Sequence, residues 1–304
     1  MTPTPQAPSL PTYVLVTPAR NEEKTLGETL QSVVAQTHLP QEWIVVSDGS
    51  TDGTDELVRD YARVHPFIRL LRLEKRPDRN FASVVFATEA GIAALETKDY
   101  AFLGLLDADV RFKPTYFADL IQRFLEQPKL GLAGGVAVDV INGQYHWHRY
   151  NPKNVAGAVH FFRRECFQAI APLTAIPEGG WDAITNVQAR AAGFDTQTFS
   201  DLIVDHLKPR NISQGGILRR KWQLGVRDYA LGYDPLFALL RYASCVSEQP
   251  LGVAALMRAG GYFTSTISLK KRYLPRQIIE LIRTEQRGRI LRAAKPGAGL
   301  TPNA

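Results

Sequence analysis

YVLVTPARNEE, at Tyr13–Glu23, decides how the chain folds, because an apolar run is followed at once by polar residues. Runs that are apolar on both faces are typical of parallel strands covered by helices. The same pattern returns at Trp43–Ser47, Ile68–Leu73 and Tyr100–Leu106. Amphipathic stretches at 23–36, 54–65 and 81–96 separate these runs. The alternation predicts an α/β fold, with a mostly parallel central sheet flanked by helices.

The second half of the chain has a looser pattern. We expect helices at 114–127 and 184–192, strands at 131–140 and 155–162, an irregular loop at 141–154, and short strands that end at Asp205–His206. Beyond residue 209 the pattern is helical, interrupted by glycine and proline. Thr54 is expected to cap a helix that continues toward His65.

Composition excludes several classes of protein. With 304 residues, 45% hydrophobic and 22% charged, the chain is neither disordered nor collagenous nor a multi-span membrane protein. Cys166 and Cys245 lie in unrelated contexts, which favours a reducing compartment. Residues 1–11 lack the basic and apolar regions of a signal peptide and are expected to form a flexible leader.

Positive charge is concentrated at one end of the chain. The net charge is +6, but residues 207–304 alone carry 17 Lys and Arg against 5 Asp and Glu. The rest of the chain is therefore acidic, at a net −6. Such asymmetry predicts different partners for the two parts.

Polar and acidic residues follow each predicted strand. Ligands bind beyond the carboxyl ends of parallel strands, so these residues mark the expected site. Asp107 and Asp109 follow a buried strand, one residue apart, where both carboxylates could reach Mg²⁺ or Mn²⁺. An isolated Asp-X-Asp is also common as a polar turn, and both interpretations stay open at this point.

SDGSTDGT, at residues 47–54, is a stronger signal. Asp48 ends a strand, where its carboxylate can accept hydrogen bonds from a nucleobase N–H or from ribose hydroxyls. Asp52 and Thr54 are explained as a turn and a helix start. The segment has neither the dinucleotide-binding glycine pattern nor a phosphate-binding P-loop.

Four motifs in order make the chain resemble the family-2 glycosyltransferases, enzymes of the GT-A fold that use nucleotide sugars. They are TPARNEE at 17–23, QSVVAQTH at 31–38, SDGSTDGT at 47–54 and LLDADV at 105–110. The resemblance is specific over residues 12–112 and looser from 113 to 206. It implies a nucleotide-sugar-binding half at 12–112, an acceptor-binding half at 113–206 and a basic helical C-terminal extension at 207–304.

The resemblance implies roles for individual residues. The nucleotide pocket would contain Thr17, Pro18, Ala19, Asn21, Glu22, Asp48, Asp107 and Ala108, with Asp78 or Arg79 closing its far side. Asp109 would bind a Mg²⁺ or Mn²⁺ ion that bridges the diphosphate, and Asp107 would face the ribose and the metal. His206 follows a strand, where it is either a further metal ligand or an ordinary strand-end histidine.

The segment EGGWDAITNVQARAAGF, at 178–194, contains the expected catalytic base. By the same resemblance, Asp182 would activate an acceptor hydroxyl for direct, inverting attack on the anomeric carbon. Glu178 is the competing candidate, because Asp182 lacks the acidic neighbour that is common in the family. Ser83-Val84 stands where relatives carry Gly-Lys, which leaves the donor open.

Two further groups of residues allow more than one interpretation. His146 and His148 would share a strand face and could hold a metal, but an acceptor-loop or surface role is favoured. Basic clusters at 219–221 and 270–272 precede Trp222 and Tyr273, which suits an anionic membrane surface better than a solvated face. No nucleic-acid-binding module is present in the sequence, so no nucleic acid is expected.

The expected function is transfer of one hexose from a nucleotide-diphosphate sugar, UDP-linked, to a glycan or polyprenyl-linked acceptor in cell-surface polysaccharide biosynthesis. The Gln-x-x-Arg-Trp motif of processive synthases is missing, which predicts one sugar per acceptor. The alternatives are a polyprenyl-phosphate sugar synthase and a catalytically silent nucleotide-sugar-binding protein. The expected location is cytoplasmic, peripheral at the inner face of the cell membrane.

Overall fold

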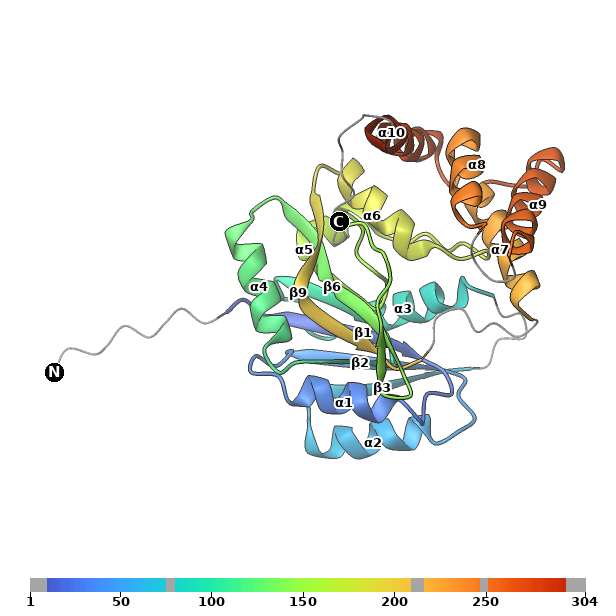
Figure 1. Ribbon diagram of the computed structural model, residues 1–304. Coiled ribbons are helices and arrows are strands. Elements are labelled where there is room, and N and C mark those ends of the chain that lie inside the picture. Colours follow the sequence, from blue (N-terminus) through green and yellow to red (C-terminus); the bar gives the residue numbers. More distant parts are fainter. Residues whose placement is uncertain (1–9, 75–79, 209–215, 247–250, 294–304) are drawn as a thin grey trace.

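The structure is a computed structural model that describes residues 10–74, 80–208, 216–246 and 251–293 (Figure 1). Its strands are β1 (Tyr13–Ala19), β2 (Glu42–Asp48), β3 (Ile68–Leu73), β4 (Phe102–Leu106), β5 (Val110–Phe112), β6 (Leu130–Ile141), β7 (Gln144–His146), β8 (Val159–Arg163) and β9 (Asp195–His206). Its helices are α1 (Leu26–Val34), α2 (Thr54–Val64), α3 (Ser83–Ala93), α4 (Tyr116–Glu126), α5 (Arg164–Ile170), α6 (Trp181–Ala191), α7 (Gly216–Ala230), α8 (Pro235–Ser244), α9 (Val253–Ile267) and α10 (Arg276–Ala293).

One sheet, in the order β3-β2-β1-β4-β8-β6-β9-β5 with β7 beside β6, runs through the molecule. The first four strands are parallel, as their apolar runs predict. The second half is mixed, because β8 is antiparallel to β4 and β6 while β6 and β9 are parallel. The α/β fold with a helix-flanked central sheet is confirmed.

Helices cover both faces of the sheet and bury its apolar side chains. The core on one face includes Leu30 of α1, Val58 of α2 and Phe117 of α4. The core on the other face includes Val85 of α3, Phe167 of α5 and Ala189 of α6. Both faces of β1 and β2 are therefore buried, and most of their side chains are apolar.

The C-terminal helices α7–α10 pack beside the sheet domain (Figure 1). Helices α7 and α9 lie so close together that a Cβ added at Gly225 would be only 1.9 Å from the Arg258 carbonyl oxygen. Glycine at this position therefore permits the close approach. Helix α10 is attached to α6 by Arg190, whose Nε lies 2.7 Å from Glu285 Oε1. Within the described residues, no helix is long and apolar enough to span a bilayer.

Several local expectations were wrong. Residues 141–154 contain the short strand β7, which forms a hairpin with β6. The short strands expected before His206 are one twelve-residue strand, β9, whose pairing with β6 shifts register between Gly135 and Val136. Thr54 does not cap α2; it is the first helical residue, and its N–H donates to Asp52 Oδ1.

Candidate active site

The carboxyl ends of β1, β2 and β4 meet at one edge of the sheet. The parallel register places Val16 of β1 beside Ile44 of β2 on one side and beside Leu105 of β4 on the other. The residues that follow these strands, 19–23, 48–54 and 107–109, therefore lie at the same edge. This is where a ligand of an open parallel sheet binds.

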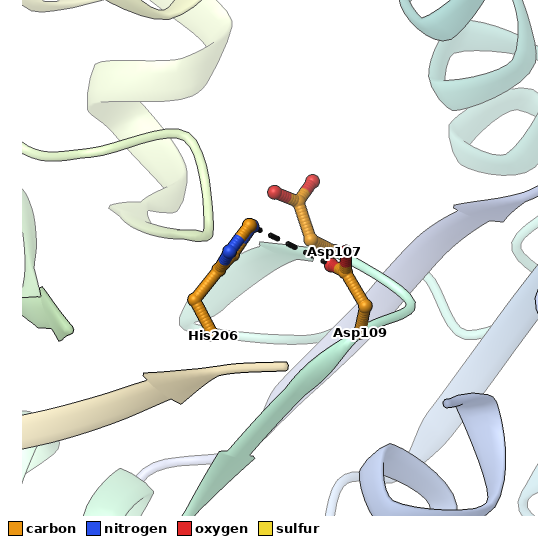
Figure 2. Close-up of side chains that lie close together, drawn as sticks. All are labelled: Asp107, Asp109 and His206. Atoms are coloured by element: carbon orange, nitrogen blue, oxygen red, sulfur yellow. Dashed lines mark ion pairs between the residues drawn. The ribbon is translucent and has the colours of Figure 1, made fainter. Parts of the chain in front are cut away.

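Asp107, Asp109 and His206 come together at this edge (Figure 2). One potential ligand atom from each lies within 4.8 Å of the others. His206 joins the aspartates because β5 pairs with β9, which places Val110 opposite His206. His206 Nε2 lies 3.7 Å from Asp109 Oδ1. The structure thus brings His206 next to two aspartates that precede it by about one hundred positions in sequence.

Asp139 is a residue that the sequence did not single out, and it contacts both His206 and His148. Asp139 lies beside His206 across the β6–β9 pair, and its Oδ1 is 3.4 Å from His206 Nδ1. Its other oxygen, Oδ2, is 2.9 Å from His148 Nε2. Asp139 is almost completely buried, at 3% exposure. Asp139 faces Nδ1 of the ring without a hydrogen bond among the described residues, while Nε2 lies on the Asp109 side. The carboxylate can therefore favour this ring orientation through its charge.

The donor set fits a divalent cation. Two carboxylates and one imidazole offer the oxygen and nitrogen atoms that Mn²⁺ accepts, and the carboxylates alone suit Mg²⁺. Asp107 and Asp109 are half-buried, so part of the coordination sphere remains open to a ligand. Among the described residues this is the one group of three acidic or histidine side chains with such spacing. His146 is absent from it, and His148 bonds Asp139 instead.

A hollow of about 330 Å³ lies at the ends of β2 and β3, beginning at Gly49, the residue after Asp48. The hollow is lined by Gly49, Ser50, Thr51, Arg72, Leu73 and Glu74. Arg20 contacts Asp48 twice, donating from Nη1 to its carbonyl oxygen at 3.1 Å and lying 3.8 Å from its carboxylate. Asp48 is therefore held in place by Arg20 at the end of β2.

Backbone geometry and hydrogen bonds hold the loop after β1 in one conformation. Asn21 has φ 53°, and its Oδ1 accepts a hydrogen bond from the Thr51 N–H at 2.9 Å. Glu22 accepts from the Thr25 hydroxyl at 2.8 Å and also bonds Lys208, just beyond β9. Lys208, which the sequence did not mark, thereby joins the first loop to the metal-binding edge.

Three members of the predicted nucleotide pocket have buried side chains. Thr17 is fully buried, and its hydroxyl accepts a hydrogen bond from the Trp43 indole at 2.9 Å. Its side chain therefore belongs to the core and does not reach the edge. Ala19 and Ala108 are 3% and 5% exposed, so their contribution to any pocket comes mainly from the backbone.

Asp182 lies in the first turn of α6. A Cβ added at Gly157 would lie 3.3 Å from the Asp182 Cβ, so the backbone just before β8 runs close to Asp182. His160 of β8 is fully buried, and burial lowers its pKa, opposed by the Val155 carbonyl and the Asp182 charge. A neutral imidazole near Asp182 is a feature that the sequence did not reveal.

Glu178 lies on the other side of the Gly179-Gly180 turn, both of whose residues have positive φ. One of its carboxylate oxygens, Oε2, is buried without a hydrogen-bond partner among the described residues. Its negative charge helps to raise the pKa of Tyr273, after the larger effect of burial. Glu178 therefore faces the C-terminal helices, whereas Asp182 is adjacent to the sheet.

Asp78 and Arg79 lie outside the described residues, so their predicted position at the far side of the pocket is not placed. Ser83 begins α3 and is buried, with its hydroxyl accepting from the Asn80 N–H at 3.4 Å. Arg190, in the family-like Arg-x-x-Gly segment, is occupied by Glu285, Thr196 and the Lys153 carbonyl. Its role in this molecule is to hold elements together.

Comparisons with known proteins identify the family. The model of "Glycosyl transferase family 2" matches residues 14–181. A poly-beta-1,6-N-acetyl-D-glucosamine synthase of Staphylococcus epidermidis is 32% identical over 115 residues, 38% of this chain and 26% of that protein. The chain thus spans about a quarter of the length of this curated relative.

Solved structures show the same fold at low sequence identity. A mannosyltransferase of Pyrobaculum calidifontis, in complex with GDP-Man and Mn²⁺, superposes with a TM-score of 0.55 at 19% identity, covering 97% of this chain and 85% of that one. TarS 1–349 of S. aureus with UDP gives a TM-score of 0.52 at 14% identity, covering 85% and 92%. With the family match over more than half of the chain, this protein belongs to glycosyl transferase family 2 and has a GT-A-like fold.

Proposed function

We propose that the protein transfers one hexose from a nucleoside-diphosphate sugar, a UDP-sugar, to a hydroxyl of a glycan or polyprenyl-linked acceptor. The observation that carries the proposal is the convergence of Asp107, Asp109 and His206 at the sheet edge where β2 also ends, at Asp48. A nucleoside fits against Asp48, and its diphosphate would then extend toward the carboxylates and the imidazole. UDP and GDP-Man occupy neighbours of the same fold, which is consistent with this arrangement.

Asp109, Asp107 and His206 would hold Mg²⁺ or Mn²⁺. Bound there, the cation supplies positive charge that stabilises the diphosphate as it leaves the sugar. The protein's own part is to fix the ligands: Asp139 aligns His206, and the β5–β9 pair fixes the spacing between His206 and Asp109. Such preorganisation lowers the cost of reorganisation when charge develops.

Asp182 is our candidate for the general base. It would accept the proton of the acceptor hydroxyl as the oxygen attacks the anomeric carbon, with inversion in a single displacement. Its place in the first turn of α6, close to Gly157 just before β8, supports this role. Glu178 is less well placed, because it faces Tyr273 and the C-terminal helices.

A biological role in polysaccharide biosynthesis is supported by the relatives. The curated relative is named as a poly-beta-1,6-N-acetyl-D-glucosamine synthase, that is, as an enzyme that makes a polysaccharide. It aligns with this chain over 115 residues. We place the protein among enzymes that add single sugars to cell-surface glycans or glycoconjugates, with its C-terminal region, 207–304, contacting the membrane at its inner face.

One observation favours a second candidate, a polyprenyl-phosphate sugar synthase. Arg220, Arg227 and Arg258 lie close enough that Arg227 and Arg258, after burial, lower the pKa of Arg220. Asp228 is the carboxylate that pairs with two of them. Clustered guanidinium groups are suited to binding a phosphate acceptor. A phosphate nucleophile needs little help from a base, so Asp182→Asn would reduce its turnover far less than turnover on a hydroxyl acceptor.

A transfer assay with a panel of nucleotide sugars, with and without Mn²⁺, tests the main proposal. We expect turnover that depends on the metal and is abolished by Asp109→Ala. Asp119→Ala is the matched control, because this aspartate lies on α4 in an exposed pair with Lys113. Full turnover by the Asp109→Ala protein would overturn the proposal.

A further inference from the structure

One end of the α7–α9 helix pair gathers apolar and basic side chains on the surface. The two helices are antiparallel, since Gly225 approaches Arg258 while Gly261 approaches the Trp222 carbonyl oxygen. The first turn of α7 therefore lies beside the last turn of α9, and Figure 1 shows the helices next to each other. We call this surface the helix-pair end and define it as Ile217, Arg219, Ile267, Leu269, Lys270 and Lys271.

The apolar members of the helix-pair end are unusually exposed. Ile217, Ile267 and Leu269 have 54%, 82% and 84% of their surface open. Arg219, Lys270 and Lys271 are also exposed. Segments 216–222 and 266–273 contain no Asp or Glu, so the charge of this surface is uniformly positive. Bulky apolar side chains among cations are typical of surfaces that rest on anionic bilayers.

Leu269 adds a second observation. It follows α9 with φ 46°, in the left-handed region that favours glycine. The Lys270 N–H donates to the Ser265 carbonyl oxygen at 3.1 Å, which closes the end of the helix. A leucine at this position is unfavourable in two ways: its Cβ is crowded in the left-handed backbone conformation, and its apolar side chain is exposed to water. Within the part of the chain that the structure describes, the side chain is 84% exposed, so little packing offsets either cost.

The helix-pair end lies next to the acceptor half of the site. Arg220, one residue beyond Arg219, stacks over the Phe81 ring at 5.0 Å. The Phe81 N–H donates to the Pro177 carbonyl oxygen, immediately before Glu178. On the α9 side, Arg272 stacks on Tyr229 at 4.7 Å and so holds the basic segment against α7. The surface is therefore a rigid continuation of the acceptor side.

We propose that the helix-pair end docks on an anionic lipid bilayer, with Ile217, Ile267 and Leu269 entering the headgroup region and the cations contacting lipid phosphates. The functional role of this docking rests on the proposed function, because docking here presents the acceptor half to a lipid-linked acceptor. The binding itself does not require turnover. Charge complementarity and continuity with the acceptor half specify the bilayer as the occupant.

Co-sedimentation with vesicles tests this with the full chain. The wild type is mixed with phosphatidylcholine vesicles and with vesicles that also contain phosphatidylglycerol. One variant combines Ile267→Ser with Leu269→Gly, and another combines Lys270→Glu with Lys271→Glu. The control combines Leu125→Ser with Lys129→Glu, an exposed leucine and lysine at the far side of the molecule, on and just after α4.

We expect the wild type and the control to bind the anionic vesicles, less tightly at high salt, and each helix-pair variant to bind at least ~tenfold more weakly. The melting temperature of the first variant should be retained, because glycine accepts the positive φ at position 269. Unchanged binding of Mn²⁺ with UDP in all variants would separate docking from the donor site.

Three results would overturn the proposal. They are wild-type protein with no preference for anionic vesicles, helix-pair variants that bind like the wild type, and a control that loses as much affinity as they do. Retention of the wild type on DNA without vesicle binding would also contradict it. None of these results bears on the metal-dependent transfer, which has its own assay.

Discussion

Buried carboxylates are the residues on which the site depends, and each is held in a different way. Asp48 is fixed by Arg20, Asp139 lies between His206 and His148, and Glu22 bonds Thr25 and Lys208. Burying a charge is costly unless it is paired. These contacts hold the carboxylates directed toward their partners.

Asp139→Asn tests whether Asp139 orients His206. The amide lacks the negative charge that faces His206 Nδ1, so we expect the affinity for Mn²⁺ with UDP to fall about 10–100-fold, the usual range for such supporting residues. Isothermal titration calorimetry measures this affinity. Asp205→Asn is the control, because Asp205 points to the other face of β9 and bonds Arg111. Equal affinities in the two variants would contradict the role of Asp139.

The sequence predicted those site residues that follow a strand within a few positions. Asp48, Asp107 and Asp109 could be found this way, because strand ends in a parallel sheet meet at one edge. Asp139 and Lys208 could not, since they reach the site through the β6–β9 and β5–β9 pairs, which join distant segments. A lone aspartate inside the apolar run at 131–140 was the signal available for Asp139.

At the scale of elements, the local pattern determined the type of each element more reliably than its pairing. The four apolar runs of the first half became parallel strands within a residue or two of their expected ends. The twelve residues of β9 look like separate strands in sequence, because the register shift near Gly135 moves their alternation to the other face. Helix α5 is too short, at seven residues, to show a helical period.

Glycines allow α7 and α9 to pack closely. Gly225→Ala places a Cβ 1.9 Å from a backbone oxygen of α9, which must move the helices apart. We expect a loss of stability of about 1–3 kcal/mol, measured by urea unfolding. Gly288→Ala in α10 is the control, because its Cβ would meet only the flexible end of Arg292, at 3.6 Å. A stabilising Gly225→Ala change would contradict close packing of this pair.

Glu42 at the start of β2 ties the sheet to the segment after α3. Burial alone would raise its pKa, but hydrogen bonds from the Thr97 and Glu96 N–H groups and from Arg69 lower it below the ordinary value of 4.5. A lowered pKa in the folded state means that this stabilisation is present above pH 4.5 and is lost as pH falls through the folded-state pKa.

Glu42→Gln should therefore destabilise the protein at neutral pH by about 1–3 kcal/mol. The difference in unfolding free energy from the wild type should shrink as the pH is lowered below 4.5. Urea unfolding at a series of pH values measures it. A difference that stays constant down to acid pH would show that the charge of Glu42 does not contribute.

For the molecule as a whole, the two signs of charge belong to different surfaces. The acidic part of the chain contains the cluster at the sheet edge, and the basic C-terminal region contains the helix-pair end. The division of charge could be predicted from the sequence. The surface where positive charge meets exposed leucine and isoleucine could not, because it depends on the antiparallel packing of α7 against α9.

The central claim is that Asp107, Asp109 and His206 hold a divalent cation together with a nucleoside diphosphate. Electron paramagnetic resonance of Mn²⁺, titrated with protein in the presence of UDP, measures this directly, because bound Mn²⁺ loses the signal of the free ion. We predict that the wild type removes the free signal in a UDP-dependent manner and that Asp109→Ala does not. Equal binding of Mn²⁺ by both proteins in the presence of UDP would contradict the account.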